Sequence, residues 1–217
     1  MTIVRSQGCS GWFHTAILVV VLVYQTQAPG VYGEAVLLDK IMAVVNDEVL
    51  TLTDFETHLA LAEVFRPALA EVDREQAFPR FIEQTLIRQE ALRTKIVEVG
   101  DVAIAQQLSA LEQRPGGQEQ LARVQQARGL SLARVRTWLR EQLIVHAFIE
   151  RRVRLFVRVS DSEVTQYYQQ HQQAIGEPLS EQIQEQIRRV LVEQRVNVRV
   201  AHLVEELKRK ANLQLPP

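Results

Sequence analysis

The chain has 217 residues, of which 47% are hydrophobic, 24% charged and 6% aromatic, and its formal net charge is −1. This composition excludes a collagen-like or extended disordered chain, and the near-neutral charge argues against a dedicated nucleic-acid binder. A single cysteine excludes a disulfide framework and a cysteine-based zinc site. The 24 glutamines and 21 arginines, beside only nine glycines and seven prolines, favour a mainly helical protein.

Residues 1–33 have the three-part layout of a secretory signal peptide. Arg5 precedes an apolar run at residues 16–24, and small residues then offer cleavage after Gly33 or Ala35. The run is shorter than the ~20 residues that a membrane-spanning helix needs, and an uncleaved anchor is the alternative interpretation. We therefore expect export of the protein and removal of residues 1–33.

The first structured element that the sequence predicts is a β-hairpin over residues 39–51. A fully apolar run at residues 41–45 is followed by the turn-forming sequence Asn46-Asp47-Glu48 and by a second short β-prone segment. Near the other end of the chain, Leu213-Gln214-Leu215 could form a short terminal strand.

Apolar periodicity and polar breaks predict seven helices between the hairpin and the terminal strand. Their expected N-terminal capping residues include Thr53, Ser131, Ser160 and Ser180, and Gly129 is expected to end one helix. Residues 156–159 are expected to form an extended connector. The predicted helical ranges are 53–65, 73–99 with its regular part from about Pro79, 101–113, 118–127, 132–154, 161–170 and 181–211.

The helix predicted at residues 132–154 is apolar on more than one side, which is typical of a central helix. His146 falls within its apolar stripe, where a core histidine with one hydrogen-bond partner is favoured over a buried pH switch. Trp138 flanks the main stripe, and simple packing is favoured over a role in lining a groove.

No catalytic constellation is visible in the sequence. The histidines after residue 33 show no i, i+4 pair, and no HExxH, GxSxG, GxGxxG or Walker sequence occurs. We therefore expect no enzyme activity, no catalytic residues, no metal site and no cofactor. Neighbouring carboxylates such as Glu205 and Glu206 are expected to lie on the solvated surface.

Residues 134–158 contain seven arginines against Glu141 and Glu150. Such a segment can bind an anionic partner. We favour the alternative that these arginines pair with carboxylates on neighbouring helices, because the chain as a whole carries no excess of positive charge.

Several short motifs follow one another in a distinctive order between about residues 36 and 170. They are Asp39-Lys40-Ile41-Met42-Ala43-Val44-Val45-Asn46-Asp47-Glu48-Val49, Thr53-Asp54-Phe55, Phe81-Ile82-Glu83-Gln84-Thr85-Leu86-Ile87, Gly129-Leu130-Ser131, Arg151-Arg152-Val153-Arg154, Val157-Arg158-Val159-Ser160-Asp161-Ser162-Glu163-Val164 and Tyr167-Tyr168. Their order and spacing resemble the N-terminal domain of the SurA family of periplasmic chaperones. Ile187-Arg188, Leu191 and residues 206–213 are similar to the C-terminal helix of that family.

The resemblance implies a division into a chaperone domain at residues 34–171 and a C-terminal helix and strand at residues 172–217 that pack back on it. It implies a mainly α fold in which Leu213–Leu215 pairs with the first strand, giving a small antiparallel sheet and a long C-terminal helix. SurA-like proteins carry parvulin prolyl isomerase domains after the Tyr-Tyr helix. The segment between His171 and Glu181 is far below the ~40 residues that an independent domain needs, so the isomerase domain is missing here.

The function implied by the resemblance is that of a periplasmic, ATP-independent chaperone that binds unfolded outer-membrane proteins without catalysis. The alternatives are a membrane-anchored assembly or partner-binding factor and a family member with residual prolyl isomerase activity. A homodimer that exchanges its last helix is also conceivable. No nucleic-acid partner is expected, nor stable membrane insertion once the signal peptide is cleaved. The sequence does not identify the client or the client-binding residues.

Overall fold

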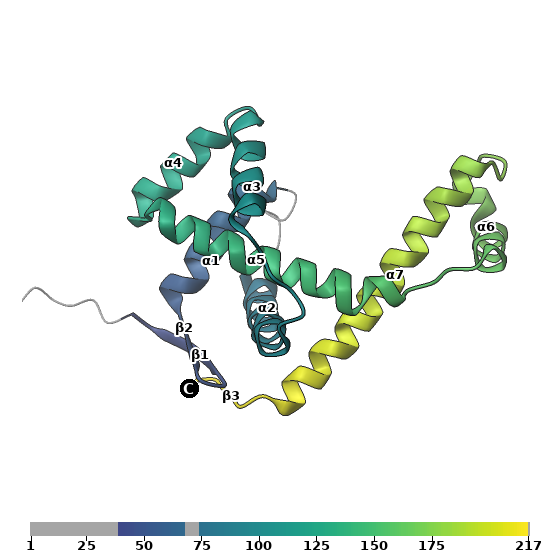
Figure 1. The fold of residues 1–217 in the computed structure, drawn as a ribbon. Coiled ribbons are helices and arrows are strands. Elements are labelled where there is room, and N and C mark those ends of the chain that lie inside the picture. The colour runs from purple at the N-terminus through teal and green to yellow at the C-terminus, as the bar shows by residue number, and fades with distance from the viewer. Residues whose placement is uncertain (1–38, 68–73, 217) are drawn as a thin grey trace, which may run out of the picture. The chain divides into compact units, whose positions relative to one another are not determined.

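The structure is a computed structural model that describes residues 39–67 and 74–216. The predicted signal peptide at residues 1–33 lies outside the described residues. Within them the protein is mainly helical, with seven α-helices and one three-stranded antiparallel sheet, as predicted (Figure 1). The elements are β1 (Ile41–Val45), β2 (Glu48–Thr51), α1 (Leu52–Phe65), α2 (Arg74–Thr94), α3 (Asp101–Gln113), α4 (Gly117–Arg128), α5 (Leu132–Arg152), the 3₁₀ helix η2 (Arg154–Phe156), α6 (Asp161–Ile175), α7 (Glu181–Lys210) and β3 (Leu213–Gln214).

The sheet joins the two ends of the described chain, in the strand order β2-β1-β3. Asn46 begins the β1–β2 turn with a φ of 57°, a left-handed conformation that asparagine tolerates better than most residues. β3 pairs antiparallel with β1, so that Val44 lies opposite Gln214. The Asn46 backbone N–H donates to the Asn212 carbonyl over 2.8 Å, and the Asn46 side-chain oxygen accepts from the Asn212 N–H over 2.9 Å. The predicted pairing of the C-terminal strand with the first strand is confirmed.

The N-cap of α1 is Thr51 rather than Thr53, so the helix begins at Leu52. The Thr51 hydroxyl accepts from the Asp54 N–H, and the Asp54 carboxylate accepts from Thr51 in return. Thr53 instead donates its N–H to Asp39. Both threonines precede an acidic residue by three positions, which is the spacing of a capping box. Thr51 is the N-cap because β2 ends at this residue.

The start of α2 agrees with the helical stretch predicted from residue 73, although its regular part begins before Pro79, and the predicted end of the helix was wrong. The helix begins at Arg74 and accommodates Pro79 near its start, where the missing N–H removes only one early hydrogen bond. It ends at Thr94 rather than at Gly100, because Lys95 adopts a left-handed conformation with a φ of 52°. Apolar periodicity beyond Thr94 therefore did not indicate helix.

The turns and caps of the later helices mostly follow the prediction. Ser131, Ser160 and Ser180 each accept a backbone N–H at the start of α5, α6 and α7, and Gly129 ends α4 in the left-handed region. The largest differences are at two helix ends: α6 continues to Ile175, and α5 ends at Arg152, two residues before its predicted bound. Phe156 belongs to η2 rather than to an extended connector.

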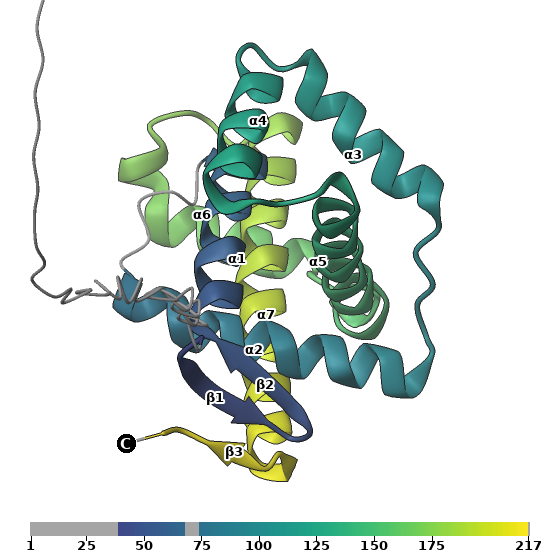
Figure 2. The ribbon, with the colours of Figure 1, turned by 90° about the vertical axis from the view of Figure 1, so that its left-hand side faces the viewer.

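The central role predicted for α5 is confirmed by two separate apolar clusters to which it contributes. Figure 2 shows the course of this helix among the other elements. Val135 and Leu139 pack with residues of α1, α3 and α4. Val145 and the fully buried Phe148 pack with residues of α2 and α7. The 30-residue α7 then contacts α6 through Ile187 and approaches the sheet through its last turn.

We predict that deletion of residues 213–217 lowers the free energy of unfolding by about 1–2 kcal/mol, because β1 loses its backbone hydrogen bonds to β3. Urea denaturation followed by circular dichroism measures the change. Removal of residues 216–217 alone is the control and should leave stability unaltered. Equal stability of the two truncated chains would contradict a structural role for β3.

Candidate functional site

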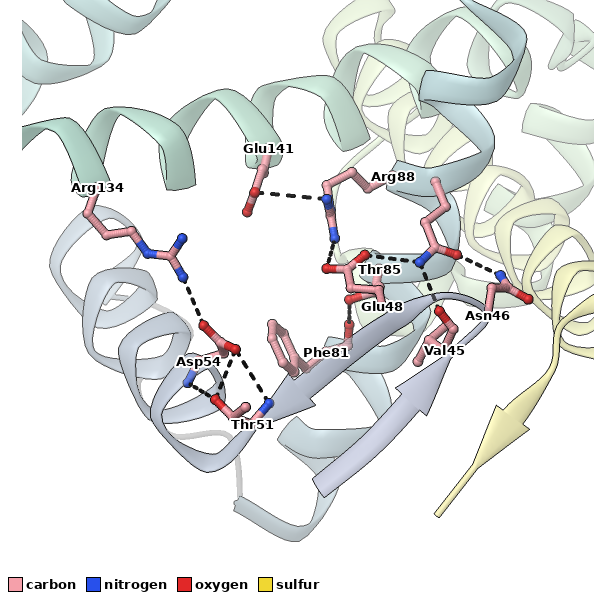
Figure 3. A network of polar contacts seen from close by, with 11 residues as sticks. Val45, Asn46, Glu48, Thr51, Asp54, Phe81, Thr85, Arg88, Arg134 and Glu141 are labelled. Atoms are coloured by element: carbon pink, nitrogen blue, oxygen red, sulfur yellow. Dashed lines mark hydrogen bonds and ion pairs between the residues drawn. The ribbon is translucent and has the colours of Figure 1, made fainter. Parts of the chain in front are cut away.

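A cavity lies where β2 meets the helices α1, α2 and α5. Its volume is about 310 Å³, at the lower limit of the ~300–1,000 Å³ typical of small-molecule sites. Figure 3 shows many of its polar residues, with Arg134 and Glu141 on α5 facing Asp54 and Arg88. The lining residues are Glu48, Leu50, Asp54, Thr57, His58, Phe81, Gln84, Thr85, Arg88, Arg134, Trp138, Glu141, Gln142 and Val145.

Regular spacing explains why these side chains meet. In a strand, residues two apart share a face, which places Glu48 and Leu50 of β2 together. In a helix, residues three or four apart share a face. The cavity residues of the helices follow this rule: Asp54, Thr57 and His58 on α1; Phe81, Gln84, Thr85 and Arg88 on α2; Arg134, Trp138, Glu141, Gln142 and Val145 on α5.

Trp138 belongs to the core and to the cavity at once. It is 7% exposed and packs with the Phe65 ring, whose centroid lies 5.5 Å away. The packing interpretation of Trp138 is therefore confirmed, and the groove-lining interpretation also holds because this residue lines the cavity. Buried Leu50 and Val145 complete the apolar part of the wall.

His58 is the buried histidine of the described chain, and the sequence analysis did not single it out. The indole Nε1–H of Trp138 donates to His58 Nδ1 over 3.2 Å. An indole N–H is only a donor, so Nδ1 must be unprotonated and the ring neutral. Burial, together with the charge of Arg66, lowers the pKa of His58 to about 4. The available signal was its i, i+3 spacing from Phe55 and Leu61, both of which are buried.

His146, the histidine that the sequence placed in the core, is exposed. The expectation was wrong because the buried positions around it are Ile144, Val145 and Phe148, and position 146 lies between the two buried faces of α5. Its side chain lines a shallower depression beside α7 instead.

Two ion pairs fix the charged side of the cavity. Arg134 donates to Asp54 over 2.8 Å, and this carboxylate also caps α1. Arg88 donates to Glu48, which accepts a further hydrogen bond from the Gln89 amide over 3.0 Å. Both guanidinium groups and both of these carboxylates therefore have close polar partners.

Glu141 is the third carboxylate of the cavity, and its negative charge has a more distant cationic partner than the other two. Its closest cationic atom is Arg88 Nη1, at 3.9 Å, and no hydrogen bond to its carboxylate is found among the described residues. Its side chain is 37% exposed, yet desolvation raises its pKa. The nearby Gln84 Oε1 is a buried oxygen without a hydrogen-bond partner in the described part of the chain.

Three of the seven arginines at residues 134–158 pair with carboxylates on other helices, so the favoured interpretation of this segment is confirmed in part. Arg140 bonds to Asp101 over 2.6 Å, and Arg154 bonds to both oxygens of Glu193 over 2.6 and 2.8 Å. Arg134 belongs to the cavity. Glu205 and Glu206 are exposed and pair with lysines of the same helix, which confirms their surface location.

No group of three or more His, Cys, Asp or Glu side chains in residues 39–67 and 74–216 is placed to hold a metal ion. No helix within these ranges has the length and apolarity required to cross a membrane.

Comparison with known proteins gives no match for this chain, either among protein-family models or among curated proteins.

We predict that the free energy of unfolding falls by about 2 kcal/mol between pH 7 and pH 5 through His58 alone. The unfolded ring binds a proton near pH 6.5, whereas the folded ring resists it until about pH 4. The contribution of His58 to the free energy of unfolding is therefore fully present above pH 6.5 and is lost as the pH falls towards 4. Urea denaturation at both pH values measures it.

The matched variants are His58→Gln, which removes the buried titrating ring, and His202→Gln, which removes an exposed one. The first should flatten the pH dependence and the second should retain it. An identical slope in both variants would show that His58 does not govern stability in this range.

Proposed function

We propose that the protein is an ATP-independent chaperone that holds unfolded outer-membrane polypeptides in the periplasm. The observation that carries this proposal is the cavity, because its wall combines buried apolar side chains with a charged rim. Such a surface binds apolar side chains of an extended polypeptide without selecting a single sequence. The resemblance of the motifs to SurA-like proteins supports the same function.

The sheet offers a second element suited to extended chains. β2 is an edge strand, and it contributes Glu48 and Leu50 to the cavity wall. An extended polypeptide can add beside such an edge through backbone hydrogen bonds and direct alternate side chains towards a pocket. This mode of binding needs no nucleotide and no covalent chemistry.

We expect the purified protein to suppress light scattering when a urea-unfolded outer-membrane porin is diluted into buffer without nucleotide. Suppression should be nearly complete at close to equimolar protein, with serum albumin as the control for non-specific protection. No suppression at large molar excess would contradict the chaperone proposal and favour a partner-specific assembly factor.

The cavity can be tested in the same assay with Gln142→Trp, because Gln142 is a half-buried residue of the cavity wall. The larger ring should obstruct the cavity and raise the amount of protein needed severalfold. Gln118→Trp, at an exposed position of α4, is the matched control and should behave as the wild type.

The proposed location predicts the mass of the protein in the cell. Cleavage of the signal peptide should remove residues 1–33, or 1–35 if the second site is used. Mass spectrometry of the protein extracted from the cell envelope measures this loss. An intact N-terminus in a membrane fraction would favour the anchored assembly factor instead.

A further inference from the structure

The charges around the cavity leave one carboxylate in excess. Its lining contains the carboxylates of Glu48, Asp54 and Glu141 but only two guanidinium groups, those of Arg88 and Arg134. His58 adds no charge, because its Nδ1 accepts the Trp138 hydrogen bond. The formal charge of the lining is therefore −1.

The excess acceptor capacity is concentrated at Glu141. Asp54 and Glu48 each accept hydrogen bonds from an arginine and from a second group. Among the described residues Glu141 has one ion pair, the 3.9 Å approach of Arg88, and a weaker attraction to Arg134, whereas a carboxylate can accept about four hydrogen bonds. Gln84 Oε1, in the same wall, is also without a donor among the described residues. A ligand that complements these two acceptors must therefore be a hydrogen-bond donor.

The apolar part of the wall indicates what the remainder of such a ligand must be. Phe81 and Trp138 both line the cavity, and aromatic faces attract cations as well as methylene groups. An acidic ligand is disfavoured, because both arginines already donate to carboxylates and Glu141 would repel it. A volume of about 310 Å³ suits one long side chain.

We propose that this cavity binds one lysine or arginine side chain of an extended polypeptide. The cationic head donates to the Glu141 carboxylate, and the methylene stem lies against Phe81 and Trp138. The proposal rests on the proposed chaperone function and adds a preference to it: clients bind best where a basic residue lies within an apolar segment.

Trp138 provides a direct readout of occupancy. The chain contains two tryptophans, so Trp12→Phe in the full chain leaves Trp138 as the only one. The probes are acetylated, amidated heptapeptides of alternating valine and serine whose central residue is lysine, norleucine or glutamate. We expect the lysine peptide to change the Trp138 fluorescence and to bind about tenfold more tightly than the other two.

Glu141→Gln should abolish the lysine preference, whereas Glu112→Gln, which removes an exposed carboxylate on α3, should retain it. The comparison of lysine with norleucine in the Trp12→Phe chain needs no cavity variant, so the test survives if Glu141→Gln fails to fold. Equal binding of the lysine and norleucine peptides, or tighter binding of the glutamate peptide, would overturn the proposal.

A further probe separates a polypeptide ligand from a free amine. N-acetyl-lysine methylamide carries the same head without the flanking residues, and we expect it to bind much more weakly than the heptapeptide. Binding of equal strength would overturn the assignment to a polypeptide. Loss of porin protection with the lysine preference intact would remove the chaperone function but not the site, so the two failures are distinguishable.

Discussion

The burial of two apolar faces of α5 is the constraint on which the rest of the fold depends. A helix with one apolar stripe needs one partner layer, whereas α5 packs with α1, α3 and α4 through one cluster and with α2 and α7 through another. The cavity lies beside this helix, where the stripe carries Arg134, Trp138 and Glu141 among apolar residues. The position of α5 therefore determines the position of the cavity.

Local chemistry made much of the fold predictable. Ser131, Ser160 and Ser180 identified three helix starts because capping is decided by a few adjacent residues. The end of α2 was missed, since residues 95–100 continue the apolar spacing and a single left-handed residue, Lys95, breaks the helix. The first N-cap was missed for a similar reason: Thr51 and Thr53 compete, and only the end of the strand selects Thr51.

The candidate site was less accessible to sequence reasoning than the fold. Its residues come from four elements, and no pair of them forms a recognised motif. The usable signal was polarity at positions that helical spacing assigns to a buried face, as at His58 and Gln84. That signal does not reveal which faces meet, so it identified neither the His58–Trp138 hydrogen bond nor the isolation of Glu141.

The closure of the sheet by β3 also constrains when folding can finish. Asn46 and Asn212, which hydrogen-bond at this seam, are 166 positions apart. Loop closure over such a distance is entropically costly and slow compared with the formation of the β1–β2 hairpin. During synthesis the hairpin therefore forms early, with one edge of β1 open until the last residues arrive. A chain that lacks its last residues keeps this edge of β1 exposed. Such a chain has an incomplete sheet and is prone to associate with other chains.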